Sequence, residues 1–232
     1  MRKFLVAATA ALLAAVPANA VIVSGTLTGG SIVTNGGTFQ VTNLATIQVN
    51  TINSANILGI NEAQKVTLGA AVRAINVDTP NGTTISLAQI NANSTLIAAG
   101  TRVNSHMIIL DPTDGTGSRN ATGSVTFNGK ILGYIVHTTN RNGATFAETN
   151  FLGAPGTTYG PLHPSLEGAG DGFAIGGSGN KTLTFSMASA RNVGDYIRVI
   201  TAVPEPRSWA MMLAGFGMVG FGLRRRRTAV AA

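Results

Sequence analysis

Short runs of β-branched residues, separated by glycine, asparagine and proline, follow one another from Val21 to Ala202. Glycine accounts for 29 of the 232 residues, and charged residues for only 11%, against roughly 25% in an ordinary globular protein. Such a mixture favours strands joined by many turns. About ten short strands without a long amphipathic helix predict an all-β fold, with a single antiparallel β-sandwich or jelly-roll-like domain over residues 21–202. A β-solenoid is the alternative, but no repeat of fixed length persists over three turns.

The clearest strand signals lie in the middle of the chain. Val103–Leu110 is long enough to be a central strand and is ended by Asp111-Pro112. Gly123–Phe127 and Lys130–Thr138 are separated by Asn128-Gly129, a dipeptide that favours two-residue hairpin turns. We therefore expect these two segments to form a β-hairpin.

Two later segments alternate apolar and polar residues, as half-buried strands do. In the strand expected at Lys181–Met187, the apolar side chains should share one face: Leu183, Phe185 and Met187. In the strand expected at Asp195–Thr201, Ile197 and Val199 should lie opposite three other residues: Tyr196, Arg198 and Ile200.

Signals nearer the N-terminus are weaker. Ile32-Val33 lies between Gly29-Gly30 and Asn35-Gly36-Gly37, so a short strand between hairpin turns is expected there. Thr46–Ile52 also alternates as a strand. Glu62–Val77 is predicted to be a strand that could include a helical turn, although Gly69 interrupts its helix-forming residues.

Residues 1–20 have the features of a secretory signal peptide. Arg2 and Lys3 supply the positive start, and an apolar stretch follows up to Pro17. Ala18-Asn19-Ala20 fits the small-x-small cleavage site of signal peptidase, so Ala18 and Ala20 predict cleavage before Val21. We expect an N-terminal signal helix, export through the Sec translocon and a mature chain that begins at Val21.

The last thirty residues, 203–232, are organised like a membrane-directed tail. Pro204-Glu205-Pro206 is followed by an apolar segment, predicted to be a transmembrane helix at about residues 207–223. After it comes a cluster of four arginines, expected to be the cytoplasmic anchor: Arg224, Arg225, Arg226 and Arg227. The fifteen residues Trp209–Leu223 extend about 22 Å as a helix, which is short for a hydrocarbon core of roughly 30 Å. Arginines beside a membrane segment stay cytoplasmic, so the body, residues 21–202, should lie outside.

The net charge of +7 arises almost entirely from the two ends. Residues 21–203 contain nine Lys/Arg and eight Asp/Glu, so the body carries only +1. No electrostatic footprint for nucleic acid remains there. The absence of cysteine excludes disulfides, thiolate catalysis, cysteine-based zinc sites and a lipid-anchored cysteine.

The tail resembles the PEP-CTERM sorting signal of exported proteins of Gram-negative bacteria, a tail type also labelled the ice-binding protein C-terminal domain. The likeness lies in Pro204, Glu205 and Pro206, followed by Trp209-Ala210, an apolar run and the arginine cluster. The resemblance implies recognition by an exosortase, cleavage near Pro204–Pro206, transient anchoring in the inner membrane with the body in the periplasm, and delivery to the cell surface or extracellular matrix alongside exopolysaccharide. Proline on both sides of Glu205 holds that segment extended, as a protease substrate needs.

Candidate chemical groups in the body are few. His106, His137 and His163 could share a metal site, but they lack short spacing, so surface or turn positions are expected instead. Asp111–Gly115 and Gly170–Gly172 could bind calcium, but such Asp/Gly stretches more often form turns. No catalytic serine arrangement, acid pair or phosphate-binding loop can be singled out. We expect no metal, no cofactor and no enzymatic activity.

The leading interpretation is a non-enzymatic structural or surface protein of the cell envelope, linked to exopolysaccharide. The alternative is a polysaccharide- or ice-binding module, since strands rich in threonine can present hydroxyl arrays. Thr26-x-Thr28 and Thr182-x-Thr184 are isolated in the sequence, however, and an ice-binding face needs a repeated array. An exported hydrolase is the third interpretation.

Overall fold

The computed structural model describes most of the body and two residues of the tail. The chain divides into two compact units: Asn19–Pro204 forms one, and Met1–Ala18 with Glu205–Ala232 forms the other. Of the second unit only residues 215–216 are described. The described residues are 20–76, 78, 94–113, 117–136, 146–162, 170–189, 194–204 and 215–216.

The regular secondary structure of the described body is almost entirely short strands, joined by turns and loops as the sequence predicts. A short helix, α1 (Ser31–Thr34), and a 3-10 helix, η1 (Ala147–Leu152), accompany them. The strands are β1 (Ile22–Gly29), β2 (Phe39–Val41), β3 (Thr46–Ile47), β4 (Ile57–Asn61), β5 (Val66–Thr67), β6 (Val72–Ile75), β7 (Ser94–Ile97), β8 (Arg102–Leu110), β9 (Arg119–Phe127), β10 (Ile131–Ile135), β11 (Thr158–Tyr159), β12 (Gly172–Gly176), β13 (Thr182–Ser189) and β14 (Asp195–Ala202).

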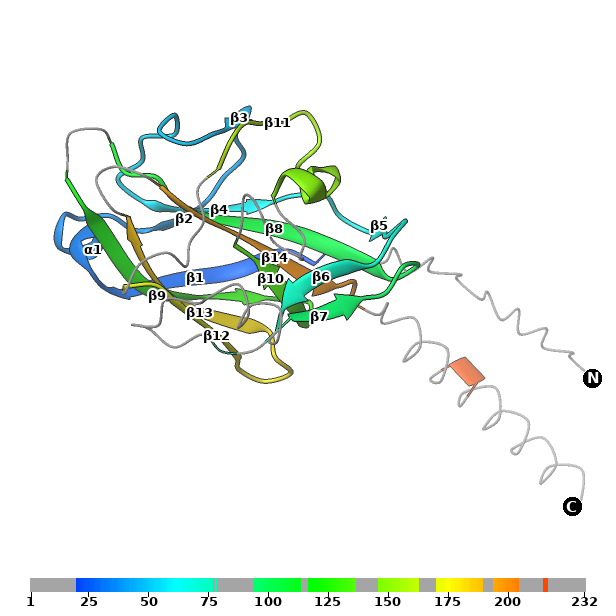
Figure 1. Cartoon of the computed structure of the whole chain (residues 1–232). Coiled ribbons are helices and arrows are strands. Elements are labelled where there is room, and N and C mark those ends of the chain that lie inside the picture. The colour runs from blue at the N-terminus through cyan, green and yellow to red at the C-terminus, as the bar shows by residue number, and fades with distance from the viewer. Residues whose placement is uncertain are drawn as a thin grey trace, which may run out of the picture. The chain divides into compact units, whose positions relative to one another are not determined.

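These strands form three sheets (Figure 1). A four-stranded sheet has the order β1-β9-β13-β12, and an eight-stranded sheet has the order β2-β4-β8-β14-β10-β6-β7, with β5 also paired to β8. The third sheet contains only β11 and β3. The all-β prediction is confirmed. The expectation of purely antiparallel pairing is wrong, because β2–β4 and β11–β3 are parallel pairs. Residues 42–56 form the long crossover that the parallel β2–β4 pair requires.

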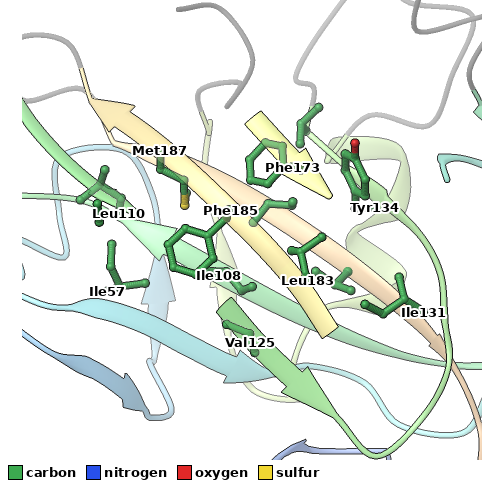
Figure 2. Packing of buried hydrophobic residues seen from close by; sticks show 14 of the residues in the cluster. Ile57, Ile108, Leu110, Val125, Ile131, Tyr134, Phe173, Leu183, Phe185 and Met187 are labelled. Carbon is green, nitrogen blue, oxygen red and sulfur yellow. The ribbon is translucent and has the colours of Figure 1, made fainter. Parts of the chain in front are cut away.

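The main hydrophobic core lies between the four-stranded and eight-stranded sheets (Figure 2). On β13, the alternation expected from the sequence is confirmed, because Leu183, Phe185 and Met187 are all buried in this core. Tyr134 of β10 meets Phe173 of β12 across the two sheets, with ring centroids 5.4 Å apart. Burial of this apolar surface is the main force that holds the two sheets together.

A second core covers the other face of the eight-stranded sheet. Its members come from that sheet and from η1, β3 and nearby loops, and they include Ile47, Phe146 and Leu152. On β14, Ile197 and Val199 enter the first core whereas Tyr196 and Ile200 enter the second, so the predicted division of faces is confirmed. A strand buried on both faces explains why apolar residues on this segment face both ways.

The hairpin predicted at Asn128-Gly129 is wrong. β9 belongs to the four-stranded sheet and β10 to the eight-stranded one, so this turn carries the chain from one sheet to the other. The Asn128 side chain accepts a hydrogen bond from the Val21 backbone N–H at 2.7 Å. A Cβ on Gly129 would come within 2.4 Å of the Ala202 carbonyl oxygen, so glycine is required by close packing here.

Other local expectations also change. Ile32 and Val33 lie in α1, not in a strand. The strand expected at Thr46–Ile52 ends at Ile47, and Asn50 follows with a positive φ of 55°. Within residues 62–76 the structure has strands β5 and β6 and no helical turn.

The predicted signal helix lies outside the described residues apart from Ala20, and the predicted transmembrane helix does so apart from residues 215–216. Within the described residues, no helix has both the length and the apolar character needed to span a bilayer.

Candidate functional site

A buried ion pair lies on the second-core side of the eight-stranded sheet. Glu62 follows β4 and Arg198 lies in the middle of β14, and neither side chain is exposed to solvent. The guanidinium binds the carboxylate with two hydrogen bonds: Nε to Oε2 at 2.8 Å and Nη2 to Oε1 at 2.9 Å. Such a two-point contact is the strongest geometry for this pair.

The remaining polar atoms of the pair are bound by neighbouring elements. The carboxylate of Glu62 accepts hydrogen bonds from Ser105 Oγ at 2.6 Å and from Tyr159 Oη at 2.7 Å. Arg198 Nη1 donates to Thr149 Oγ1 at 2.7 Å and to the Phe146 carbonyl at 3.1 Å. This cluster, which we call the Glu62–Arg198 cluster, ties η1 and β11 to the sheet.

The electrostatics of the Glu62–Arg198 cluster favour the charged pair. Burial lowers the pKa of Arg198, but the attraction of Glu62 and the nearby Tyr159 together raise it above its usual value. Burial and then the Glu62 charge raise the pKa of Tyr159, which keeps its hydroxyl protonated as a donor. The Glu62 and Arg198 side chains are fully buried and Tyr159 is half-buried, so the charged pair itself contacts only protein groups.

The sequence interpretation missed this cluster, since its two charged members are 136 residues apart. One signal was present. Arg198 stands in the middle of an apolar strand, and a charge in such a position needs a buried partner.

A cavity of about 590 Å³ adjoins the cluster through Thr149. Its rim includes two exposed apolar side chains, Leu96 and Phe151, and two charged residues, Arg73 and Glu148. Arg73 Nη1 donates a hydrogen bond to Ser94 Oγ at 3.1 Å. The cavity therefore offers an apolar surface with one charge of each sign, a composition common in ligand sites.

His106 is a buried structural residue, so the expectation of a surface or turn position is wrong for it. It lies in β8 with no exposed surface, and its ring contacts Phe127 at a centroid distance of 4.8 Å. Nδ1 is 2.9 Å from Asn61 Oδ1, and Nε2 is 3.1 Å from Thr201 Oγ1. Because the Asn61 oxygen only accepts, we assign the proton to Nδ1. Burial lowers the pKa of His106 to about 3, so the ring is neutral at physiological pH.

The two stretches considered for calcium serve as backbone anchors where the structure describes them. Asp111 Oδ2 accepts a hydrogen bond from the Ile52 backbone N–H at 3.0 Å, and burial raises the pKa of this carboxyl. Asp171 Oδ1 accepts one from the Ala188 N–H at 2.9 Å. In the part of the chain that the structure describes, no three His, Asp or Glu side chains gather into a group that could hold a metal ion. His137, His163 and Asp114 lie outside it.

The predicted processing residues fall at the two limits of the body. Ala20 is buried, and Val21 is 36% exposed with its N–H bound to Asn128. Pro204 is the last described residue of the body. The other residues assigned to cleavage, sorting and anchoring lie outside the described residues: Ala18, Glu205, Pro206, Trp209, Ala210, Arg224, Arg225, Arg226 and Arg227. The cleavage and sorting assignments, and the cytoplasmic position of the four arginines, therefore stay predictions.

The last strand ends at the first residue of the segment that matches the sorting-motif family model. β14 reaches Ala202, whose N–H donates to the Lys130 carbonyl at 2.8 Å. The family model described as the PEP-CTERM protein-sorting motif matches residues 202–227. No curated protein and no solved structure matches the chain. Through this tail the chain carries a PEP-CTERM protein-sorting motif, which marks it as an exported protein targeted to exosortase.

Proposed function

We propose that the body is a non-enzymatic structural or surface protein of the cell envelope, linked to exopolysaccharide and released from a transient inner-membrane anchor by exosortase. The Sec translocon brings it across the membrane, signal peptidase removes residues 1–20, and cleavage near Pro204–Pro206 frees the body. The position of the sorting motif, which begins at the last residue of β14, carries this proposal.

The end of the fold supports such a cut. The compact unit of the body extends from Asn19 to Pro204, and β14 makes its last ladder pairing at Ala202. Cleavage at residues 204–206 therefore leaves every described strand and its pairing in place. A fold whose hydrogen bonds end before the cut tolerates truncation there.

The hydrogen bonds and ion pair of the buried polar groups support a structural role. In the described body, Glu62 and Arg198 neutralise each other away from solvent, and Asp111 binds backbone N–H. His106 is neutral and has a partner for each ring nitrogen. Each of these groups stabilises strand or loop contacts, and none is presented at an open surface with a perturbed pKa, as a catalytic acid or base would be.

The intact mass of the protein from its native host tests the sorting step. In the normal strain we expect a chain that starts at Val21 and ends near Pro204–Pro206. In a strain that lacks the exosortase gene we expect the tail to remain and the protein to stay in the inner membrane. Equal masses in the two strains would refute the proposal. A variant with Pro204 and Pro206 both changed to alanine should retain its tail in the normal strain, whereas the matched variant Pro155→Ala, within the body, should be processed normally.

A further inference from the structure

Three neighbouring strands place hydroxyl side chains on the outer face of the four-stranded sheet. β9 lies in the middle, with β1 on one side and β13 on the other. The pairing registers align two rows of these side chains across the strands. In the third row a register shift in β1 pairs Thr122 with Gly29, and Thr28 joins the row through its hydroxyl contact with Thr122. The rows, which together we call the hydroxyl face, are Ser24–Thr126–Thr182, Thr26–Ser124–Thr184 and Thr28–Thr122–Ser186.

The alternation of each strand shows that these nine side chains point away from the core. Their neighbours on β9 and β13, such as Val125 and Phe185, are buried between the sheets. On β1, Leu27 packs against the same core, while Thr26 and Thr28 are exposed. The sequence showed two separate Thr-x-Thr pairs, and the fold joins them through β9 into one array. The two pairs are isolated in the sequence, and hydroxyl side chains of β9 lie between them in the sheet.

The hydroxyl face is partly pre-arranged. Thr28 Oγ1 lies 3.2 Å from Thr122 Oγ1, and Thr126 Oγ1 lies 3.2 Å from Thr182 Oγ1, so hydroxyls of adjacent strands hydrogen-bond to one another. Rows of a sheet recur about every 7 Å along the strands, and strands are about 4.8 Å apart. Each hydroxyl can still donate or accept toward a ligand, because the group has one donor and two acceptor positions.

One end of the hydroxyl face is hollowed. A cavity of about 410 Å³ lies there, and Thr28, Thr122, Thr184, Ser186 and Asp78 contribute to its lining. Asp78 is held at this edge, since its Oδ1 accepts a hydrogen bond from the Ile175 N–H at 3.0 Å. The volume is within the range of about 300–1,000 Å³ that is usual for ligand sites. All nine side chains of the hydroxyl face are uncharged, so a neutral partner with many hydroxyl groups matches it best.

We propose that the hydroxyl face binds a segment of a neutral polysaccharide, with a few sugar residues in the hollow and the chain continuing across β9 toward β1. This inference rests on the proposed surface role and names the ligand class and its site. Adjacent strands of a sheet are rotated by roughly 20–25° relative to each other, so three strands present a twisted surface. A flexible polymer can follow that surface, whereas the planar lattice of ice cannot match all three rows at once.

The test uses the full chain with ¹³C-labelled threonine methyl groups, held in phosphocholine micelles so that no sugar detergent competes. The probes are hexasaccharides of neutral glucan, mannan and galactan, with hexagalacturonate as the charged comparator. We expect at least one neutral hexamer to shift the methyl signals of Thr26, Thr122 and Thr184, and hexagalacturonate to bind at least fivefold more weakly. The signal of Thr67, an exposed strand threonine of the other sheet, should not move.

A variant that combines Thr26→Val, Ser124→Ala and Thr184→Val removes the middle row and keeps strand-compatible shapes. We expect its affinity for the same hexamer to fall at least tenfold, with an unchanged far-ultraviolet circular dichroism spectrum. The matched variant Thr67→Val should bind as the unmodified protein does. Should the middle-row variant itself misfold, Thr184→Val alone should lower the affinity at least threefold.

The inference is overturned if no neutral hexamer shifts these methyl signals, or if the middle-row variant binds unchanged. Thermal hysteresis that disappears in the middle-row variant would assign the hydroxyl face to ice and likewise overturn it. None of these results affects the mass difference expected between strains with and without exosortase. The proposed function and this inference are therefore tested independently.

Discussion

Replacing Arg198 with methionine tests whether the Glu62–Arg198 cluster holds the second core together. The substitution keeps an unbranched apolar stem and removes the guanidinium. It leaves the Glu62 carboxylate buried with only two hydroxyl donors, Ser105 and Tyr159. It also removes the hydrogen bonds that Arg198 Nη1 donates to Thr149 Oγ1 and to the Phe146 carbonyl.

The expected decrease in the free energy of unfolding follows from the polar groups that the substitution leaves buried. Removing one partner of a buried ion pair costs about 3–5 kcal/mol, because the other charge stays uncompensated. The two acceptors that lose Arg198 place the expected loss toward the upper end of that range. For a domain of this size about 1 kcal/mol shifts the melting temperature by roughly 2–4 °C, so we expect a decrease of roughly 6–20 °C.

The assay is thermal unfolding of the full chain, followed by far-ultraviolet circular dichroism. Arg102→Met is the matched control, since Arg102 is an exposed arginine on the adjacent strand β8. Exposed ion pairs contribute at most about 1 kcal/mol, so the control should melt within about 4 °C of the unmodified protein. If Arg198→Met were to melt no lower than Arg102→Met, the claim that this buried pair anchors η1 and β11 would be refuted.

Three further changes probe other parts of the structure. A chain that ends at Pro204 should match the stability of the full chain within about 0.5 kcal/mol, and a larger loss in chemical denaturation would show that the body depends on the tail. His106 has a pKa of about 3 against an ordinary value of 6.5, so it contributes stability that is complete above pH 6.5 and is lost as the pH falls toward 3. Between pH 7 and pH 4 the free energy of unfolding of the unmodified protein should fall by about 3 kcal/mol more than that of the His106→Gln variant. Equal decreases in the two proteins would contradict the claim that a buried, neutral His106 stabilises the fold. Gly25→Ala should destabilise by about 1–3 kcal/mol, because its Cβ would overlap the Phe39 ring. Gly69→Ala, where nothing lies within 4 Å of the added Cβ, is its control.

The predictions that succeeded rest on local patterns. The alternation of Leu183, Phe185 and Met187 identified the face of β13 that enters the core, because side chains of a strand alternate between its faces. The length of Val103–Leu110, which is ended by Asp111-Pro112, identified β8, and β8 pairs with β4, β5 and β14 near the middle of the larger sheet.

The predictions that failed concern which other part of the chain a segment pairs with. Asn128-Gly129 has the composition of a tight turn, but composition does not state whether the next strand pairs with the previous one. Here Gly129 packs against the Ala202 carbonyl and Asn128 binds Val21, so contacts distant in sequence direct the chain into the other sheet. Gln48–Ile52 is not a strand, since Asp111, far along the chain, accepts the Ile52 N–H.

The sequence by itself determined the sorting tail, the all-β class and the inward faces of several strands. The tail is identified by a linear motif, because the family model matches the order of its residues. Only the tertiary structure decided that Glu62 meets Arg198 and that three hydroxyl rows share one sheet face. Both depend on strand order and register, which are set by the packing of two cores over the whole body and not by any single stretch of residues.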